Sequence, residues 1–215
     1  MIQHLVIPLE LTRKSPSMLS HNPFADLLPA AVMQTYVVLM FLLVVGGTIL
    51  DTIHKKSAKY FFQAAQKAKK NQTRSVGGGE KASIAVKTAV HDVMLSGEFC
   101  NARRRIAHLL GMYGFVIFLV TTVILIFSYP TSATPAPATV TGLWHIGALM
   151  VCVGGYWFWF VIRVDVAAEG NAWYRIIRAD LFILALLATA TFALIWSYLQ
   201  MRGDGIWTTL ALVLF

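Results

Sequence analysis

The chain has 215 residues, a formal net charge of +8, a hydrophobic fraction of 57% and a mean hydropathy of +0.65. Only 13% of the residues are charged, so the apolar residues are too many for one soluble core, and the composition is that of a membrane protein. The sequence contains no phosphate-binding glycine loop and no hydrolase or metalloprotease motif, which argues against nucleotide-dependent or hydrolytic catalysis.

Residues 1–29 form an arm before the first long apolar run. Its first twelve residues contain no Lys or Arg, and no short apolar core ends in a cleavage-like group of small residues. We therefore expect the arm to remain on the mature protein rather than to act as a secretory signal. Pro23 and Pro29 flank the stretch FADLL, which predicts an interfacial turn or short helix that leads into the first span.

Four apolar runs are each long enough to cross a hydrocarbon core of about 30 Å, which takes about 20 helical residues. They cover residues 30–50, 106–127, 143–162 and 181–199. Their continuous apolar character differs from the short alternating segments of a membrane β-barrel. The sequence therefore predicts an all-α membrane protein, with a four-helix transmembrane domain over residues 30–200 and a C-terminal tail over residues 201–215.

The basic residues are concentrated in two of the connections between the spans. Residues 55–105 contain twelve Lys and Arg, residues 163–178 contain three, and residues 128–142 contain none. By the positive-inside rule the two basic connections face the cytoplasm, and both chain ends lie on the opposite side. Topology accounts for most of this charge, and the rest suits anionic headgroups or an acidic partner, so nucleic-acid binding is not indicated.

The long basic loop, residues 51–105, contains two stretches that favour helix. Residues 54–72 are basic and are expected to continue the first helix out of the bilayer, until Gly77–Gly79 interrupt the pattern. Residues 80–98 predict an amphipathic helix at the membrane surface or a docking face for a partner. His91 in this stretch has no second ligand-type residue at helical spacing, so we interpret it as a surface histidine.

Histidines near the spans are the first candidates for function, because ionisable groups in a membrane are costly. His108 opens the second span and His54 follows the first, so both are expected near the cytoplasmic face. His145 opens the third span near the opposite face, where only His4 or His21 of the arm could meet it. A b-type haem needs axial imidazoles from facing helices at matching depth, as His54 and His108 provide. The alternative for each is an interfacial histidine beside headgroups.

Two spans also carry faces of small residues, which let membrane helices approach closely. Packing is the leading interpretation, although a flat porphyrin edge could use the same room. The charged residues Asp51, Arg163 and Asp180 lie at span ends, which argues against a transporter, whose charges lie near the midplane. The two faces are His108, Gly111, Phe115, Phe118 and Thr122 in the second span, and His145, Ala148, Cys152 and Gly155 in the third.

Residues 100–115, CNARRRIAHLLGMYGF, resemble the opening of the second helix in a membrane cytochrome b family. That family includes the nitrate reductase gamma subunit and the membrane part of the quinone-interacting membrane-bound oxidoreductase. The shared pattern is a basic stretch, a histidine, an apolar pair and an aromatic–Gly–aromatic triplet. Residues 178–195, RADLFILALLATATFALI, resemble the family's fourth helix. Within this group the sequence is most similar to the short membrane anchor associated with dissimilatory adenylylsulfate reductase in sulfur-oxidising bacteria.

The resemblance implies a subunit of the bacterial cytoplasmic membrane, which is consistent with both termini lying in the periplasm. Such a subunit docks a soluble flavin and iron–sulfur oxidoreductase, here expected to be adenylylsulfate reductase, and passes its electrons to quinone. The chain's two cysteines cannot supply the four thiolates of an iron–sulfur cluster, so any cluster belongs to the partner.

The resemblance carries His108 over as an axial haem ligand, with His54 as its only same-depth partner in this chain and a histidine of another subunit as the alternative partner. Arg103, Arg104 and Arg105 would then pair with the haem propionates.

The sequence also departs from the two-haem members of the family. Those members carry a second histidine two to three turns further along the helix, where this chain has Phe118. They draw the opposing ligands from a fifth helix, and residues 205–215 are too few to span a bilayer. We therefore expect at most one haem b. The alternative function is a haem-free structural anchor or assembly subunit, in which His108 only caps a helix.

Overall fold

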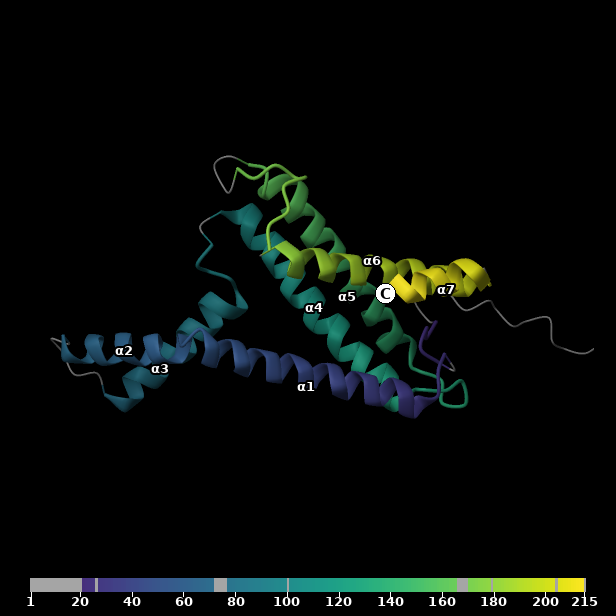
Figure 1. The fold of residues 1–215 in the computed structure, drawn as a ribbon, viewed down its shortest axis with the longest axis horizontal. Coiled ribbons are helices and arrows are strands. Elements are labelled where there is room, and N and C mark those ends of the chain that lie inside the picture. Colours follow the sequence, from purple (N-terminus) through teal and green to yellow (C-terminus); the bar gives the residue numbers. More distant parts are fainter. Residues whose placement is uncertain are drawn as a thin grey trace, which may run out of the picture.

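The structure is a computed structural model that describes residues 21–25, 27–71, 77–99, 101–165, 170–178, 180–203 and 205–214. Within these ranges it is all-α, with no strand (Figure 1). Four helices are long and apolar enough to cross a membrane, which confirms the predicted fold class. They are α1 (Ala30–His54), α4 (Ala102–Ser128), the continuous helix of α5 (Ala138–Trp157) with the π-helical turn η3 (Phe158–Ile162), and α6 (Asp180–Arg202).

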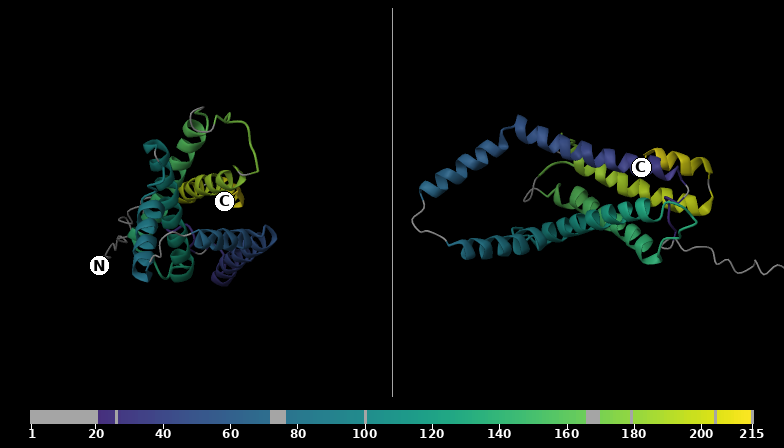
Figure 2. Two further views of the ribbon diagram at one scale, coloured as in Figure 1. Left: turned by 90° about the vertical axis from the view of Figure 1, so that its left-hand side faces the viewer. Right: turned by 90° about the horizontal axis from the view of Figure 1, so that it is seen from below.

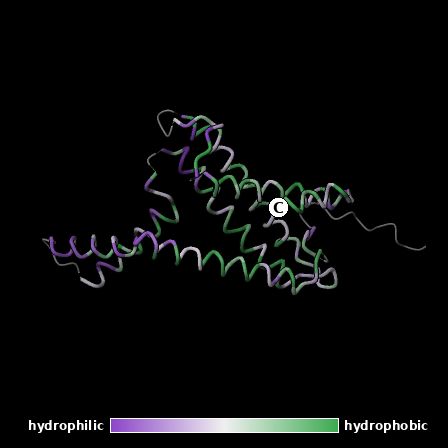
Figure 3. Tube along the Cα trace, in the orientation of Figure 1, coloured by the Kyte–Doolittle hydropathy of each residue, from purple (hydrophilic) through white to green (hydrophobic). Residues whose placement is uncertain are grey.

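The remaining helices are short and lie outside the four spans. α2 (Ser57–Lys70), α3 (Gly78–Thr88) and the π-helical turn η2 (Ala89–Met94) occupy the long basic connection, and their side chains are largely exposed. Figure 3 shows hydropathy changing from apolar in α1 to polar in α2. Lys56 between them adopts a left-handed conformation with φ of 54°. α2 is therefore a separate helix rather than the predicted extension of the first.

The two ends of the four spans differ in how many basic residues their connections carry. α1 and η3 end, and α4 and α6 begin, toward the same end (Figures 1 and 2). We call this the basic end, because the two connections rich in Lys and Arg leave from it. The start of α5, the end of α6 and the N-terminal arm lie at the opposite end.

Among the described residues, α4 and α5 make the most extensive helix–helix contact. Glycine residues of α5 allow the two backbones to approach closely. A Cβ atom added at Gly147 would lie 2.7 Å from the backbone nitrogen of Phe118, and one at Gly154 would lie 2.8 Å from the carbonyl oxygen of Ala107. Trp144 also donates its indole N–H to Thr122 Oγ1 at 2.9 Å. Small residues bring the two backbones together, but Gly147 and Gly154 are not members of the predicted small-residue face of the third span, whose Gly155 packs on α6 instead.

α6 packs on a different side of α5, where Gly155 receives the side chain of Leu187. Among the described residues, α4 and α6 do not approach each other and are joined only through α5. After Gly203, which has a φ of 73°, the chain folds back so that α7 (Gly205–Leu214) packs on α6 and buries Ala211. Most of the predicted C-terminal tail is thus a short apolar helix.

α1 stands apart from the other spans along most of its length. Near its start, Gln34 donates its amide N–H to the carbonyl oxygen of Ile126 at 3.3 Å. Toward the basic end α1 and α4 diverge, as Figures 1 and 2 both show. The apolar side chains of α1 are exposed on the protein, and bilayer lipid suits them as a neighbour.

The described part of the N-terminal arm closes the opposite end of the helices. Residues 23–25 form the turn that the flanking prolines predict. Phe24 is buried edge-on between Trp144 of α5 and Trp196 of α6, with ring centroids 5.6 and 5.5 Å away. Gln200 donates its amide N–H to the carbonyl oxygen of Pro23 at 3.0 Å. Residues 1–20 of the predicted arm lie outside the described residues.

Candidate functional site

A cavity of about 580 Å³ lies at the basic end between α4 and α6. It exists because both helices pack on α5 but not on each other, which leaves a wedge between them. Its volume lies within the range of about 300–1,000 Å³ that is usual for small-molecule sites. Its lining residues are Phe99, Arg104, Ala107, His108, Gly111, Met112, Phe115, Val151, Gly154, Gly155, Phe158, Asn171, Ile177, Asp180, Phe182, Ile183 and Leu186.

The walls of the cavity are mostly apolar and include four phenylalanines. Phe115 comes from α4, Phe158 from η3, Phe182 from α6 and Phe99 from the segment before α4. Gly111 on α4 has no atom within 4 Å of the position of an added Cβ, so its open side faces the cavity rather than a packed helix. The small-residue face of the second span therefore forms a cavity wall near its start.

His108 is the imidazole of this cavity. It is exposed on the cavity wall, and its Nδ1 lies 2.9 Å from Ser96 Oγ. The Phe99 ring packs against it with a centroid distance of 5.0 Å. Because Nδ1 is hydrogen-bonded to Ser96, Nε2 is the ring nitrogen that can hydrogen-bond to a ligand.

The segment that brings Ser96 to His108 was not predicted. Residues 94–99, which we call the strap, cross the start of α4. Arg105 donates Nε–H to the carbonyl oxygen of Leu95 at 2.7 Å, and Tyr113 donates its hydroxyl to the carbonyl oxygen of Met94 at 2.8 Å. The Ser-Gly pair at 96–97 is the only sequence signal, since such a pair marks a turn.

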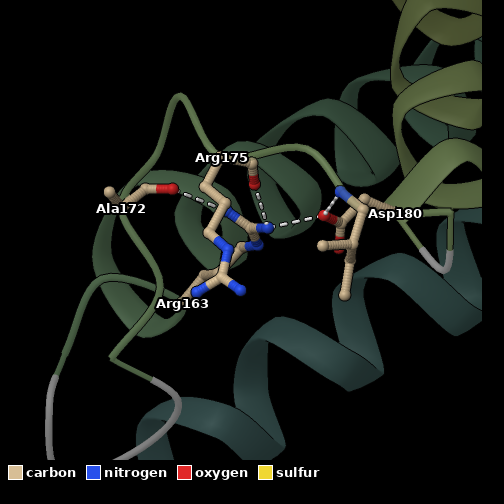
Figure 4. A network of polar contacts seen from close by, with 5 residues as sticks. Arg163, Ala172, Arg175 and Asp180 are labelled. Carbon is tan, nitrogen blue, oxygen red and sulfur yellow. Dashed lines mark hydrogen bonds and ion pairs between the residues drawn. The ribbon is translucent and has the colours of Figure 1, made fainter.

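A buried ion pair joins the two helix ends beside the cavity (Figure 4). Arg163, whose side chain is 1% exposed, bonds Asp180 Oδ2 through Nη2 at 2.5 Å. It also donates to the carbonyl oxygens of Ala172 at 2.9 Å and Arg175 at 2.5 Å, and it lies over the Trp159 ring at 4.2 Å. These contacts hold the connection after η3 against the start of α6, where Asp180 lines the cavity.

The three arginines that were predicted to act together make different contacts. Only Arg104 lines the cavity. Arg105 bonds the strap, and the Arg103 side chain is exposed. The backbone N–H of Arg103 donates to Asn101 Oδ1 at 2.9 Å, so Asn101 caps α4. Of the three, Arg104 is thus the one at the cavity, and their pairing with haem propionates stays a prediction.

His54 is not brought beside His108. It ends α1, which has diverged from α4 at the basic end, and its side chain is exposed (Figures 1 and 2). The two histidines match in depth along the sequence, but the helices that carry them are apart. The structure thus separates the predicted ligand pair.

A haem with two axial histidines does not fit the described residues. His108, with Nδ1 held by Ser96, resembles half of such a site. Across the cavity from it, the described lining offers no second imidazole, and Met112 lies one turn away on the same helix. Phe118, at the position of the family's second histidine, is 6% exposed and packs on Trp144. In the described ranges no three His, Cys, Asp or Glu side chains gather as a metal site.

The histidines at the opposite end have structural partners. His145 is buried, and its Nδ1–H donates to the carbonyl oxygen of Thr141 at 2.7 Å, while Nε2 lies 2.8 Å from Ser197 Oγ. His21 bonds Gln200 at 3.1 Å. His145 therefore joins α5 to α6 with both ring nitrogens engaged, and His4 lies outside the described residues.

Comparisons with protein-family models, curated proteins and solved structures find no match for the chain. What the cavity can bind therefore follows from its own residues. Aromatic walls favour a flat apolar ring, and His108, Arg104 and Asn171 supply hydrogen-bonding groups at its edge.

Proposed function

We propose that the chain is the membrane subunit of an electron-transfer complex, which anchors a soluble flavin and iron–sulfur oxidoreductase and binds quinone between α4 and α6. The cavity carries this proposal. A quinone has a flat apolar ring and carbonyl oxygens that accept hydrogen bonds. Phenylalanine walls suit the ring, while His108 and Arg104 can donate to the oxygens.

The position of the cavity supports this proposal. It lies at the basic end, which the positive-inside rule assigns to the cytoplasm of a bacterial membrane. A soluble enzyme docked at that end would be near the bound quinone, so the electron path between them is short. Phe182 is 74% exposed and Phe115 is 36% exposed, which gives the cavity an apolar rim suited to a ligand that arrives from lipid.

The basic connection suits the docking of an acidic enzyme surface. α2 has no acidic residue, and its lysines are exposed together with those that precede it. Opposite charge steers association and orients the partners. Adenylylsulfate reductase, to which the sequence resemblance points, is the first enzyme to test, and the sulfur chemistry would belong to that partner. The lysines are Lys55, Lys56, Lys59, Lys67, Lys69 and Lys70.

No step of this proposal passes through haem, because the described residues do not offer two axial ligands. The alternative function is an anchor that holds no redox ligand at all. The two functions differ in whether the cavity takes quinone, which a binding experiment decides.

The experiment compares two glycine substitutions in the purified chain in lipid nanodiscs. Gly111→Leu fills the cavity, and Gly47→Leu is the matched control on the exposed face of α1; neither position has an atom within 4 Å of an added Cβ. Short-tail ubiquinone and menaquinone are titrated while tryptophan fluorescence is followed. We expect saturable binding in the parent and in Gly47→Leu, and at least tenfold weaker binding in Gly111→Leu. No saturable binding in the parent refutes the quinone site, and equal binding in Gly111→Leu places it elsewhere.

A further inference from the structure

Ser96 adopts a conformation that is unfavourable for its residue type. Its φ is 49°, and Lys56 is the only other non-glycine residue with positive φ among the described residues. Such backbone strain persists where the surroundings impose it, and it is common at functional sites. Ser96 is also 1% exposed, although the helices before it in the basic connection are exposed.

Contacts of the strap residues on both sides of Ser96 hold it in this conformation. The carbonyl oxygens of Met94 and Leu95 accept bonds from α4, as described above. On the other side, a Cβ at Gly97 would lie 2.8 Å from the backbone carbonyl oxygen of His91, so a larger residue would require the backbone to shift. These contacts set the Ser96 hydroxyl at 2.9 Å from Nδ1 of His108.

A hydroxyl differs from other histidine partners because it can both donate and accept. When Ser96 donates to Nδ1 of His108, Nε2 carries the proton and is a donor. When Ser96 accepts from Nδ1–H, Nε2 is an acceptor. His145 shows the contrast, because its Nδ1 faces the carbonyl oxygen of Thr141, which only accepts and so selects one tautomer.

We propose that Ser96 is a positioning residue for His108, which orients the ring and lets Nε2 offer the cavity either a donor or an acceptor. A quinone carbonyl needs a donor, and a quinol hydroxyl needs an acceptor. One imidazole can therefore hold both redox forms of the ligand. The role toward quinone rests on the proposed function, whereas the pairing of Ser96 with His108 does not.

The test uses Ser96→Gly, which removes the hydroxyl and also relieves the left-handed backbone. The variant should be folded with an unchanged or higher thermal midpoint, so that misfolding does not explain a lost ligand. Ser96→Ala is the second variant, and Ser83→Ala, at an exposed position of α3, is the control. Two quantities are measured in nanodiscs: the ¹⁵N resonances of the His108 ring, assigned with His108→Gln, and the affinities for short-tail quinone and quinol.

We expect both Ser96 substitutions to move the Nδ1 resonance of His108 and to weaken quinone and quinol binding by roughly fivefold or more. Ser83→Ala should change neither. Unchanged ring resonances, or unchanged affinities for both forms in a folded Ser96→Gly protein, overturn the proposal. If the parent binds no quinone, the proposed function fails. A moved Nδ1 resonance then still supports the pairing, and an unmoved one overturns it.

Discussion

Neutralising Asp180 should destabilise the protein far more than neutralising an exposed carboxylate. Asp180→Asn keeps the shape of the side chain but removes its charge. Arg163 would then remain 1% exposed without a counter-ion, with only neutral partners: the asparagine oxygen, the carbonyl oxygens of Ala172 and Arg175, and the Trp159 ring. A buried charge that loses its counter-ion is costly because it cannot regain its hydration.

The size of the effect follows from the geometry. Removing one partner of a fully buried pair costs about 3–5 kcal/mol. Asp180 is 12% exposed, and the asparagine oxygen can still accept from Arg163 and from the backbone N–H of Ile177. We therefore expect Asp180→Asn to lower the free energy of unfolding by about 2 kcal/mol, within the range for a hydrogen bond to a charged group. Asp180→Leu, which removes the acceptor as well, should cost about 3–4 kcal/mol.

The assay is reversible unfolding of the purified chain in mixed micelles by increasing sodium dodecyl sulfate, followed by circular dichroism. Asp51→Asn is the control, because Asp51 pairs with Lys55 at 2.9 Å on the surface of α1, with both side chains more than half exposed. Such a pair at i,i+4 is worth only about 0.3–0.5 kcal/mol. A double-mutant cycle of Arg163→Met with Asp180→Asn should give a coupling of at least about 1 kcal/mol. A loss in Asp180→Asn no larger than in Asp51→Asn, or no coupling in the cycle, would refute the reasoning.

Three further predictions follow from the packing, the charge pattern and the histidines. Gly147→Leu should destabilise the protein by about 3 kcal/mol, because its Cβ would lie 2.7 Å from the Phe118 backbone; unfolding like that of the parent would contradict this. Raising salt from about 0.15 to 1 M should release the docked enzyme in co-purification, since the Debye length falls from about 8 to 3 Å; a salt-resistant complex would indicate an apolar contact. The dithionite-reduced absorption spectrum of the purified chain should show no b-type haem; a stoichiometric haem signal would overturn this expectation, and its loss in both His54→Ala and His108→Ala would identify these histidines as the ligands.

The four spans were predictable from the sequence because burial in lipid depends on local composition. About twenty consecutive apolar residues suffice to specify a membrane helix, whatever its neighbours are. The structure extends each predicted span, for example from residues 106–127 to Ala102–Ser128, because backbone hydrogen bonding continues into polar flanks. Asn101 caps the start of this helix.

One wall of the candidate site could also be predicted from the sequence. His108, Gly111 and Phe115 recur at helical spacing, so they share a face, and all three line the cavity. The same geometry argues against the arginine cluster, since consecutive helical residues point about 100° apart. Arg103, Arg104 and Arg105 therefore leave α4 in different directions, and Arg104 is the one that lines the cavity.

Only the tertiary structure decided which helices stand side by side. Sequence gives the depth of a residue in the membrane, and depth made His54 and His108 equivalent candidates. Lateral position depends instead on where backbones can meet, and Gly147 and Gly154 join α5 to α4 while Gly155 joins it to α6. The glycines of α1 meet no neighbour, and α1 diverges from α4 toward the end that carries His54. The pairing of Ser96 with His108 could not be predicted either, because it depends on contacts between the strap and α4, which the helical pattern of the sequence does not show.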